Sequence, residues 1–176
     1  MKACVIFDTL FGNTEKIAIS LRAGLRSAGV VAECVNMKEV ALDSLVRYDL
    51  LCVGGPTQYR TISKTMQDFL EMVEKLGLSG KKGFAFDTRR DAFMAGSAAV
   101  GIEKGLQKSG LKVIRTRASA IIVGPDFDRK KSEFNDKDEW KEWRHKNERL
   151  LEGEERRFEQ IGREIGTILN KAEISD

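Results

Sequence analysis

Apolar runs and helix-periodic segments alternate along the whole chain. Short runs rich in β-branched and aromatic residues predict five strands. The first four are 3–7, 30–35, 48–53 and 83–86, and the fifth begins at 113–114 and continues, past a polar interruption, through 120–123. Between them, apolar residues recur every three or four positions and predict helices at 14–28, 40–45, 66–76, 97–109 and 158–169. Strands separated by helices at this spacing require crossover connections. The pattern therefore predicts an α/β fold, a doubly wound five-stranded parallel sheet with helices on both faces.

A polar stretch from Pro125 to about Leu150 separates the fifth strand from the last helix. It contains Trp140 and Trp143, whose spacing allows both to share one face of a helix. That face would cover either the body of the protein or a contact with another subunit. We interpret 125–150 as a polar insertion, with some helix in it, before the last helix.

Length and composition fit one globular domain spanning 1–176. The 176 residues are 41% hydrophobic and 32% charged, enough to bury a sizeable core without a metal or a disulfide. Cys4, Cys34 and Cys52 form no C-x-x-C pair, which argues against zinc fingers and disulfide scaffolds and for a reducing compartment. Because no apolar stretch approaches the ~20 residues that span a bilayer, we expect a cytoplasmic protein without a membrane span.

The formal net charge of +3 is the difference between two unlike parts of the chain. Residues 1–124 hold 18 Lys and Arg against 12 Asp and Glu, whereas residues 125–176 hold 12 against 15. The basic residues of the first part are scattered, without a basic run that is interleaved with aromatics. We therefore expect no nucleic-acid partner.

Three loops are the expected location of a ligand. In open parallel sheets, ligands bind beyond the carboxyl ends of the strands, near the point where the strand order reverses. The loops that follow strands one, three and four are 8–14, 54–61 and 87–96.

The first of these loops has the composition of a phosphate-binding loop. It leads from a buried strand into a helix, whose first N–H groups carry a partial positive charge. Thr9 and Thr14 add hydroxyls, Asn13 adds an amide, and Gly12 lets the backbone come close or adopt positive φ. Such a loop can wrap a phosphate monoester without Lys or Arg. The alternative is that Thr14 only caps the helix and Gly12 only makes a turn.

Other phosphate motifs do not fit this chain. Neither G-x-x-x-x-G-K-[ST] nor G-x-G-x-x-G follows the first strand, which argues against nucleoside triphosphatases and dinucleotide-binding folds. A receiver domain needs an acidic residue at the end of strand three, where Gly54 and Gly55 stand. Asp8 lacks the D-x-D-x-T or D-x-Y-G-T context of phosphatases that use a strand-end Asp as nucleophile.

Three segments of the chain resemble the flavodoxin family. The stretch 5–21, VIFDTLFGNTEKIAISL, is similar to the flavodoxin phosphate loop, and YDLLCVGGPT at 48–57 resembles the end of strand three in that family. FDTR at 86–89, followed by GSAA at 96–99, resembles the third loop of microbial and archaeal relatives. The resemblance covers about 1–124 and the last helix, leaves 125–150 unmatched, and implies the strand order 2-1-3-4-5.

The resemblance implies that the ligand is FMN. Its phosphate would be bound by backbone amides and hydroxyls of the first loop, from Thr9, Leu10, Phe11, Gly12, Asn13 and Thr14. Tyr59 is the candidate to stack on the isoalloxazine ring, although a loop tyrosine can equally cover core, and Phe93 is a weaker candidate for the opposite face. Backbone groups of the other two loops would address the ring edge, from Pro56, Thr57, Gln58, Tyr59, Arg60, Asp87, Thr88, Arg89 and Arg90. Electron transfer through a flavin needs no catalytic side chain and no metal, and none is predicted.

The second loop departs from the family pattern. Many flavodoxins have a glycine there whose peptide can turn toward the reduced ring, whereas 57–61 contains none. Such a turn would need positive φ at a residue with a side chain, which costs roughly 1 kcal/mol or more. We therefore expect weaker stabilisation of the one-electron reduced flavin than is usual in the family.

The charge around the three loops departs as well. Flavodoxins are typically acidic around the flavin, but here the rim is basic, with Lys16, Arg60, Lys64, Arg89 and Arg90. A basic rim predicts a redox partner protein with an acidic docking surface. The alternative is that the arginines pair locally with Asp87 and Asp91.

The leading hypothesis is therefore an FMN-binding flavodoxin-like protein that carries one or two electrons. A second hypothesis is an FMN-dependent NAD(P)H:quinone-type reductase, for which a basic rim would suit anionic substrates. A third is a binding module that keeps the fold and has lost the flavin, against which the intact loop 9–14 argues.

Overall fold

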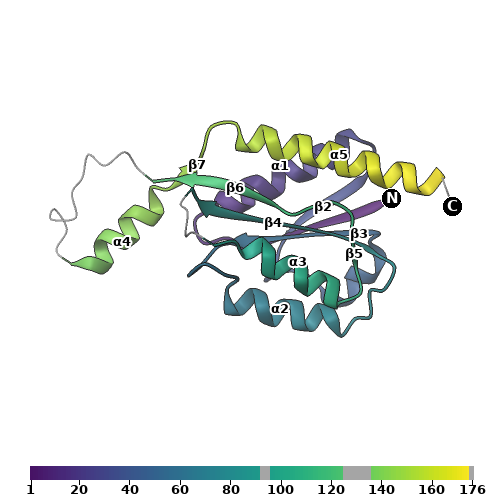
Figure 1. The fold of residues 1–176 in the computed structure, drawn as a ribbon, viewed down its shortest axis with the longest axis horizontal. Coiled ribbons are helices and arrows are strands. Elements are labelled where there is room, and N and C mark those ends of the chain that lie inside the picture. Colours follow the sequence, from purple (N-terminus) through teal and green to yellow (C-terminus); the bar gives the residue numbers. More distant parts are fainter. Residues whose placement is uncertain (92–95, 125–135, 175–176) are drawn as a thin grey trace.

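The computed structural model describes residues 1–91, 96–124 and 136–174, and its centre is one twisted sheet (Figure 1). Five strand positions run parallel in the order β2-β1-β3-β4-β6, which confirms the predicted fold class and order. Their bounds are β1 (Lys2–Phe7), β2 (Val31–Asn36), β3 (Leu50–Pro56), β4 (Lys82–Arg90) and β6 (Ala118–Val123).

The edge of the sheet beyond β4 differs from the prediction in two ways. The fifth strand is divided into a short β5 (Lys112–Val113) and the longer β6, and both pair with β4 in parallel. In addition, β7 (Arg149–Leu150) pairs with β6 in the antiparallel direction. An antiparallel edge strand on an otherwise parallel sheet is common in doubly wound folds.

Helices cover both faces of the sheet (Figure 1). One face packs on α1 (Asn13–Ser27) and α5 (Glu154–Ile174), and the other packs on α2 (Lys64–Glu74) and α3 (Ala98–Lys108), with a 3-10 turn η1 (Leu42–Arg47) after β2. Side chains of a strand alternate between its faces, so Ala3, Val5 and Phe7 of β1 lie in the first core, and Cys4 and Ile6 lie in the second. Both cores form because these strands are apolar on both faces.

The two helices of the first face touch through glycines. A Cβ at Gly24 of α1 would lie 1.9 Å from the Glu159 carbonyl oxygen of α5, and one at Gly162 of α5 would lie 2.3 Å from the Leu21 carbonyl oxygen. The helix backbones are therefore in direct contact, and these positions admit only glycine.

Strands three and four run past the ends that the sequence predicts. The Gly54-Gly55-Pro56 segment, expected to stop strand three, is paired with β4 as Gly54↔Phe86, Gly55↔Asp87 and Pro56↔Thr88. A Cβ at Gly54 would lie 2.2 Å from the Phe86 ring, so this glycine makes room for a core aromatic residue and does not end the strand. β4 continues to Arg90 because β6 pairs with it over that length. The expectation that 87–90 belong to a loop was therefore wrong.

The described part of the insertion is a helix and a returning strand. α4 (Lys137–Lys146) lies beyond the carboxyl ends of the sheet strands, away from the body of the protein (Figure 1). It carries the half-buried Trp140 and Trp143, and the Arg144 guanidinium lies 4.6 Å from the centre of the Trp140 ring. The expected helix within 125–150 is thus present, and its own arginine covers one of the tryptophans.

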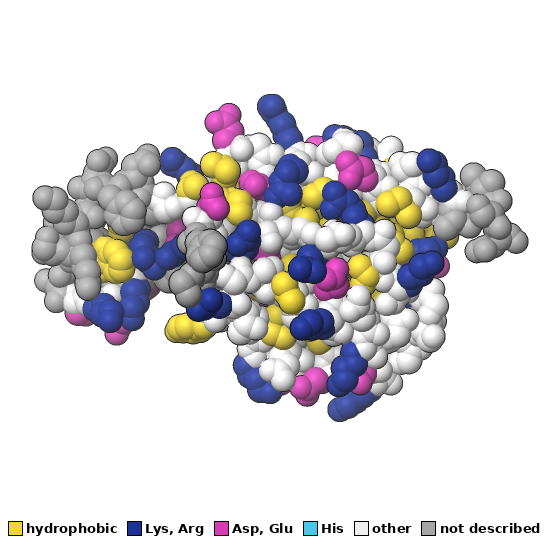
Figure 2. Space-filling model, viewed as in Figure 1, with side chains coloured by type: hydrophobic (Ala, Val, Ile, Leu, Met, Phe, Trp, Pro, Cys, Tyr) yellow, Lys and Arg dark blue, Asp and Glu magenta, His cyan; other side chains and the backbone are white. Residues whose placement is uncertain are grey.

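Lys and Arg side chains are dispersed over the face seen in Figure 2, among acidic and apolar ones. None of the helices within the described ranges combines the length and apolarity that crossing a bilayer requires.

Candidate cofactor site

The first loop presents an uncapped helix N-terminus. Gly12 is the N-cap of α1 with φ 81°, and no side chain caps the helix. The first-turn N–H groups, those of Asn13, Thr14 and Glu15, have no carbonyl acceptor within the helix. Because the helix dipole adds partial positive charge there, an anion is the natural acceptor. The alternative that Thr14 is the cap was wrong, since Thr14 lies inside the first turn.

The polar side chains of this loop have separate functions. Thr9 Oγ1 accepts a hydrogen bond from the Gly12 N–H at 3.0 Å, which leaves the hydroxyl proton of Thr9 to donate. Thr14 is buried, and its hydroxyl lies 2.9 Å from that of Thr88 on β4. Asn13 is buried as well and donates from Nδ2 to the Glu148 carbonyl oxygen at 3.1 Å. The two buried side chains therefore fix the loop, and Thr9, with the exposed Leu10 and Phe11, forms its outer surface.

The second loop contains a tight two-residue turn. Gln58 and Thr61 exchange two backbone hydrogen bonds of 3.0 and 2.9 Å, and the residues between them, Tyr59 and Arg60, have φ 44° and 75°. Positive φ at both central positions is the type I′ geometry that Asn-Gly usually supplies. The loop therefore already contains the positive φ that we expected to be costly, at roughly 1 kcal/mol or more for each residue.

The Tyr59 side chain is 98% exposed. Tyr59 therefore covers no core, and the alternative prediction that it does was wrong. A fully exposed aromatic residue held in a strained turn has its ring free to contact a ligand or a partner.

A buried carboxylate joins the second loop, β4 and α3. Asp87 is fully buried, and its Oδ2 accepts hydrogen bonds from the Thr57 hydroxyl (2.9 Å), the Ser97 hydroxyl (2.7 Å) and the Ala99 N–H (3.0 Å). The Thr57 N–H donates to the Thr88 carbonyl oxygen at 2.9 Å. The side chains of Thr57 and Asp87 thus hold the edge together through Asp87 Oδ2, and Pro56 and Gln58 are half-buried.

The third loop touches the second one. Gly96 has φ 71°, and a Cβ on it would lie 2.2 Å from the Arg60 carbonyl oxygen. The positions of the two loops are therefore coupled through the backbone. Phe93, the other candidate for ring stacking, lies outside the described residues.

The arginines at the end of β4 do not pair with Asp87. Arg90 forms an ion pair with Glu148, which is buried and lies next to β7 of the insertion. Arg89 donates to the Gly96 carbonyl oxygen at 3.5 Å. Glu148 therefore connects the insertion to the end of β4 through Arg90 and to the phosphate loop through Asn13. The sequence pattern did not indicate a role for Glu148, because this residue stands in a run of mixed charges without any motif.

The three cysteines are protonated structural residues. Burial raises the pKa of Cys4 to about 12 and that of Cys34 to about 11, and it raises the pKa of Cys52 well above its ordinary value. Thiols held in this form are poor nucleophiles. Cys4 and Cys52 are buried, and Cys34 is half-buried.

The sheet is open and doubly wound, and a loop without Lys or Arg leads from its first strand to a helix N-terminus that no side chain caps. These features define a class of α/β proteins that bind a phosphorylated ligand at the carboxyl edge. Residues 5–140 match the family model described as Flavodoxin. The chain belongs to the flavodoxin family.

Individual relatives agree with this assignment. A flavodoxin from Clostridium saccharobutylicum is 27% identical over 125 residues, which cover 70% of this chain and 77% of the relative. An NAD(P)H dehydrogenase (quinone) from Azorhizobium caulinodans is 27% identical over 109 residues, which cover 48% of this chain and 55% of the relative. The solved structure of a flavodoxin from the domain Archaea superimposes with a TM-score of 0.73 at 20% identity, over 97% of this chain and 99% of that chain. The protein is thus a flavodoxin-like electron carrier, of a family whose members use a flavin cofactor and act with redox partners.

Proposed function

We propose that the flavin is FMN, and that the protein carries one or two electrons between partners with the cofactor at the carboxyl edge of the sheet. The single observation that carries this proposal is the N-terminus of α1, where Gly12 provides no cap and the loop contains no basic side chain. Donors of this kind match a phosphate monoester. Bound FMN supplies the redox chemistry, and the protein supplies binding and orientation.

Each part of the edge has a role in this proposal. The first-turn amides and the Thr9 hydroxyl bind the phosphate, while the buried Asn13 and Thr14 keep that loop in place. The exposed Tyr59 ring stacks on the isoalloxazine. Backbone groups of the second loop and of the end of β4 face the ring edge, and Phe93 remains a proposed contact.

The test separates the phosphate from the ring. We expect the purified protein to be yellow, and its apoprotein to bind FMN much more tightly than riboflavin, because riboflavin lacks the phosphate. Thr9→Val should weaken FMN binding by about tenfold, the value of one charge-assisted hydrogen bond, and leave riboflavin binding unchanged. Thr65→Val, at an exposed position of α2, is the matched control. Equal affinity for FMN and riboflavin would refute the phosphate assignment, and a colourless protein that no flavin reconstitutes would indicate the flavin-free binding module.

We further propose an acidic docking surface on the redox partner. Lys16 and Arg60 are exposed at the edge, and no ion pair in the described ranges occupies them. The exposed apolar side chains of Leu10, Phe11 and Tyr59 lie on the same loops. An apolar centre with a basic rim favours an acidic partner, whose association weakens as salt rises. Electron-transfer rates that do not change with ionic strength would exclude it.

A second candidate function is an FMN-dependent NAD(P)H:quinone-type reductase. The similarity to the Azorhizobium quinone dehydrogenase favours it, although that similarity spans about half of each chain. Oxidation of NADH or NADPH with a quinone as acceptor is the assay: turnover by the yellow protein supports the reductase, and its absence supports the carrier.

A further inference from the structure

A polar hollow lies on the α3 face of the sheet, away from the phosphate loop. Its volume is about 370 Å³, and it is bounded by the end of β4, the start of α3 and the strand β6. The lining residues are Arg89, Gly96, Ser97, Val100, Thr116, Arg117 and Ser119. Side chains alternate along β4, so Thr88 points to Thr14 on the α1 face and Arg89 points to the opposite face. The hollow is therefore separate from the phosphate loop.

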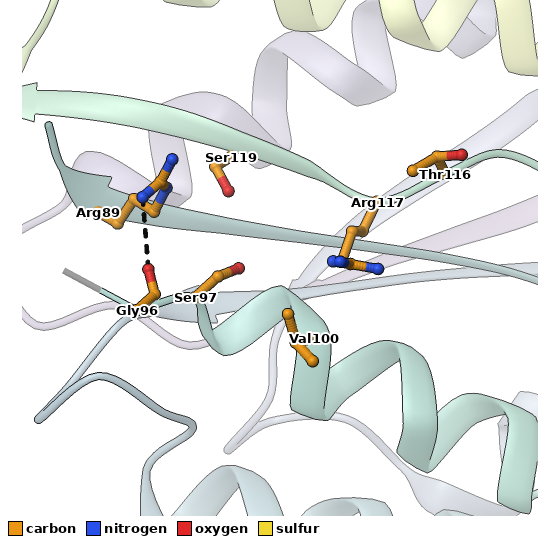
Figure 3. Close-up of a pocket in the computed structure, with 7 residues that line it drawn as sticks. All are labelled: Arg89, Gly96, Ser97, Val100, Thr116, Arg117 and Ser119. Atoms are coloured by element: carbon orange, nitrogen blue, oxygen red, sulfur yellow. Dashed lines mark hydrogen bonds between the residues drawn. The ribbon is translucent and has the colours of Figure 1, made fainter. Parts of the chain in front are cut away.

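Two arginines stand at its two ends. Figure 3 shows Arg89 and Arg117 on either side of the hollow, with Ser97 and Ser119 between them. Arg117 forms an ion pair with Glu103 at 2.6 Å, so its charge is largely balanced. The Ser97 hydroxyl is bonded to Asp87.

Arg89 is not balanced in this way. Its one hydrogen bond in the described part of the chain is to the Gly96 carbonyl oxygen, at the long distance of 3.5 Å (Figure 3). Its Nε atom is buried and has no acceptor among the described residues. A buried donor on a cation that lacks an acceptor is costly, and an oxyanion can accept from two guanidinium N–H groups at once.

We propose that this hollow binds a small oxyanion, a carboxylate or a phosphate, with Arg89 as its main ligand, Ser119 as a further donor and Arg117 as a second positive charge. The site is distinct from the FMN phosphate site, and it does not require that the flavin be FMN. Bound there, the anion would lie against the return of the third loop at Gly96.

The experiment is a titration of the ¹⁵N-labelled protein, followed by amide NMR shifts at constant ionic strength, with sodium phosphate in one series and sodium succinate in the other. We expect saturable shifts at Gly96, Ser97 and Ser119. In the apoprotein, phosphate should also shift Asn13 and Thr14, and FMN should abolish those shifts and leave the first set. Saturation by only one of the anions still supports the site and identifies its class.

Variants distinguish specific binding of the anion in this hollow from non-specific attraction of anions to basic side chains. Arg89→Gln should weaken the binding by about tenfold or more. Arg163→Gln removes the same group from α5, where Arg163 is half-buried and paired with Glu159, and it should leave the binding unchanged. If Arg89→Gln does not fold, Arg117→Gln takes its place, with a smaller loss expected. Shifts that rise linearly without saturation, or equal affinity in the Arg89 and Arg163 variants, would overturn the proposal. Failure of FMN to displace phosphate from Asn13 and Thr14 would instead contradict the proposed function.

Discussion

Gly96→Ala tests whether the second and third loops support each other. The added Cβ would lie 2.2 Å from the Arg60 carbonyl oxygen, 2.5 Å from its Cα and 2.6 Å from its carbonyl carbon. The closest of these contacts is about 1 Å inside the 3.4 Å at which ordinary van der Waals contact begins. All three are backbone atoms, which cannot turn aside as a side chain can. Either one of the two loops therefore moves, or the overlap remains as strain in the folded protein.

Gly80→Ala is the matched control. Gly80 has φ 83°, close to the 71° of Gly96, but a Cβ there would meet no atom within 4 Å. Both variants therefore lose roughly 1 kcal/mol through the unfavourable φ, and only Gly96→Ala adds steric overlap, which typically costs about 1 to 3 kcal/mol. The difference between the two variants isolates the contact between the loops.

Two assays together detect this energy. If the loops stay in place, the loss appears in the free energy of unfolding of the apoprotein, measured with urea. If a loop moves, it appears as a roughly 5- to 150-fold loss of FMN affinity, because the ring site is displaced. Should Gly96→Ala match Gly80→Ala in both assays, the reasoning about the coupled loops is wrong.

Three further predictions concern the turn, the helix pair and pH. Tyr59→Gly should raise the stability of the apoprotein by about 1 kcal/mol, since glycine tolerates φ 44°. The same change should lower FMN affinity about three- to tenfold, because the stacking ring is lost. A fall in both stability and affinity would contradict this prediction. Gly162→Ala should lower the free energy of unfolding by about 2 to 3 kcal/mol, whereas Gly105→Ala, whose Cβ would meet only side-chain atoms, should lower it less in the same thermal or urea unfolding experiment. In the folded protein the pKa of Cys4 is raised to about 12 and that of Cys34 to about 11, from 9.0. The contribution of these thiols to the free energy of unfolding should therefore be fully present below pH 9 and be lost as pH rises toward 12, by up to about 1.4 kcal/mol per pH unit for Cys4. Unfolding curves of Cys4→Ala at increasing pH should show a shallower decline.

Much of the fold follows from local patterns in the chain. The alternation of apolar runs with helical periods depends on neighbouring residues, and crossover connections have a fixed hand, so the parallel sheet and its two layers of helices could be predicted. The phosphate loop could be predicted for the same reason, because a strand end, Gly12 and a helix start are adjacent in sequence. Strand ends were harder, since β3 and β4 are extended by pairing with each other and with β6.

The sequence by itself determined the fold class and the donors of the phosphate loop, since both arise from residues that are near one another along the chain. Only the tertiary structure decided that Asn13 is bound by Glu148, 135 residues away, that Asp87 holds the second loop to α3, and that Arg89 lies in a hollow on the opposite face from the phosphate loop. These contacts depend on which strands become neighbours and on which face each side chain emerges. Their partners come from loops and an insertion without sequence periodicity, so their positions are set by packing and hydrogen bonding in the folded chain.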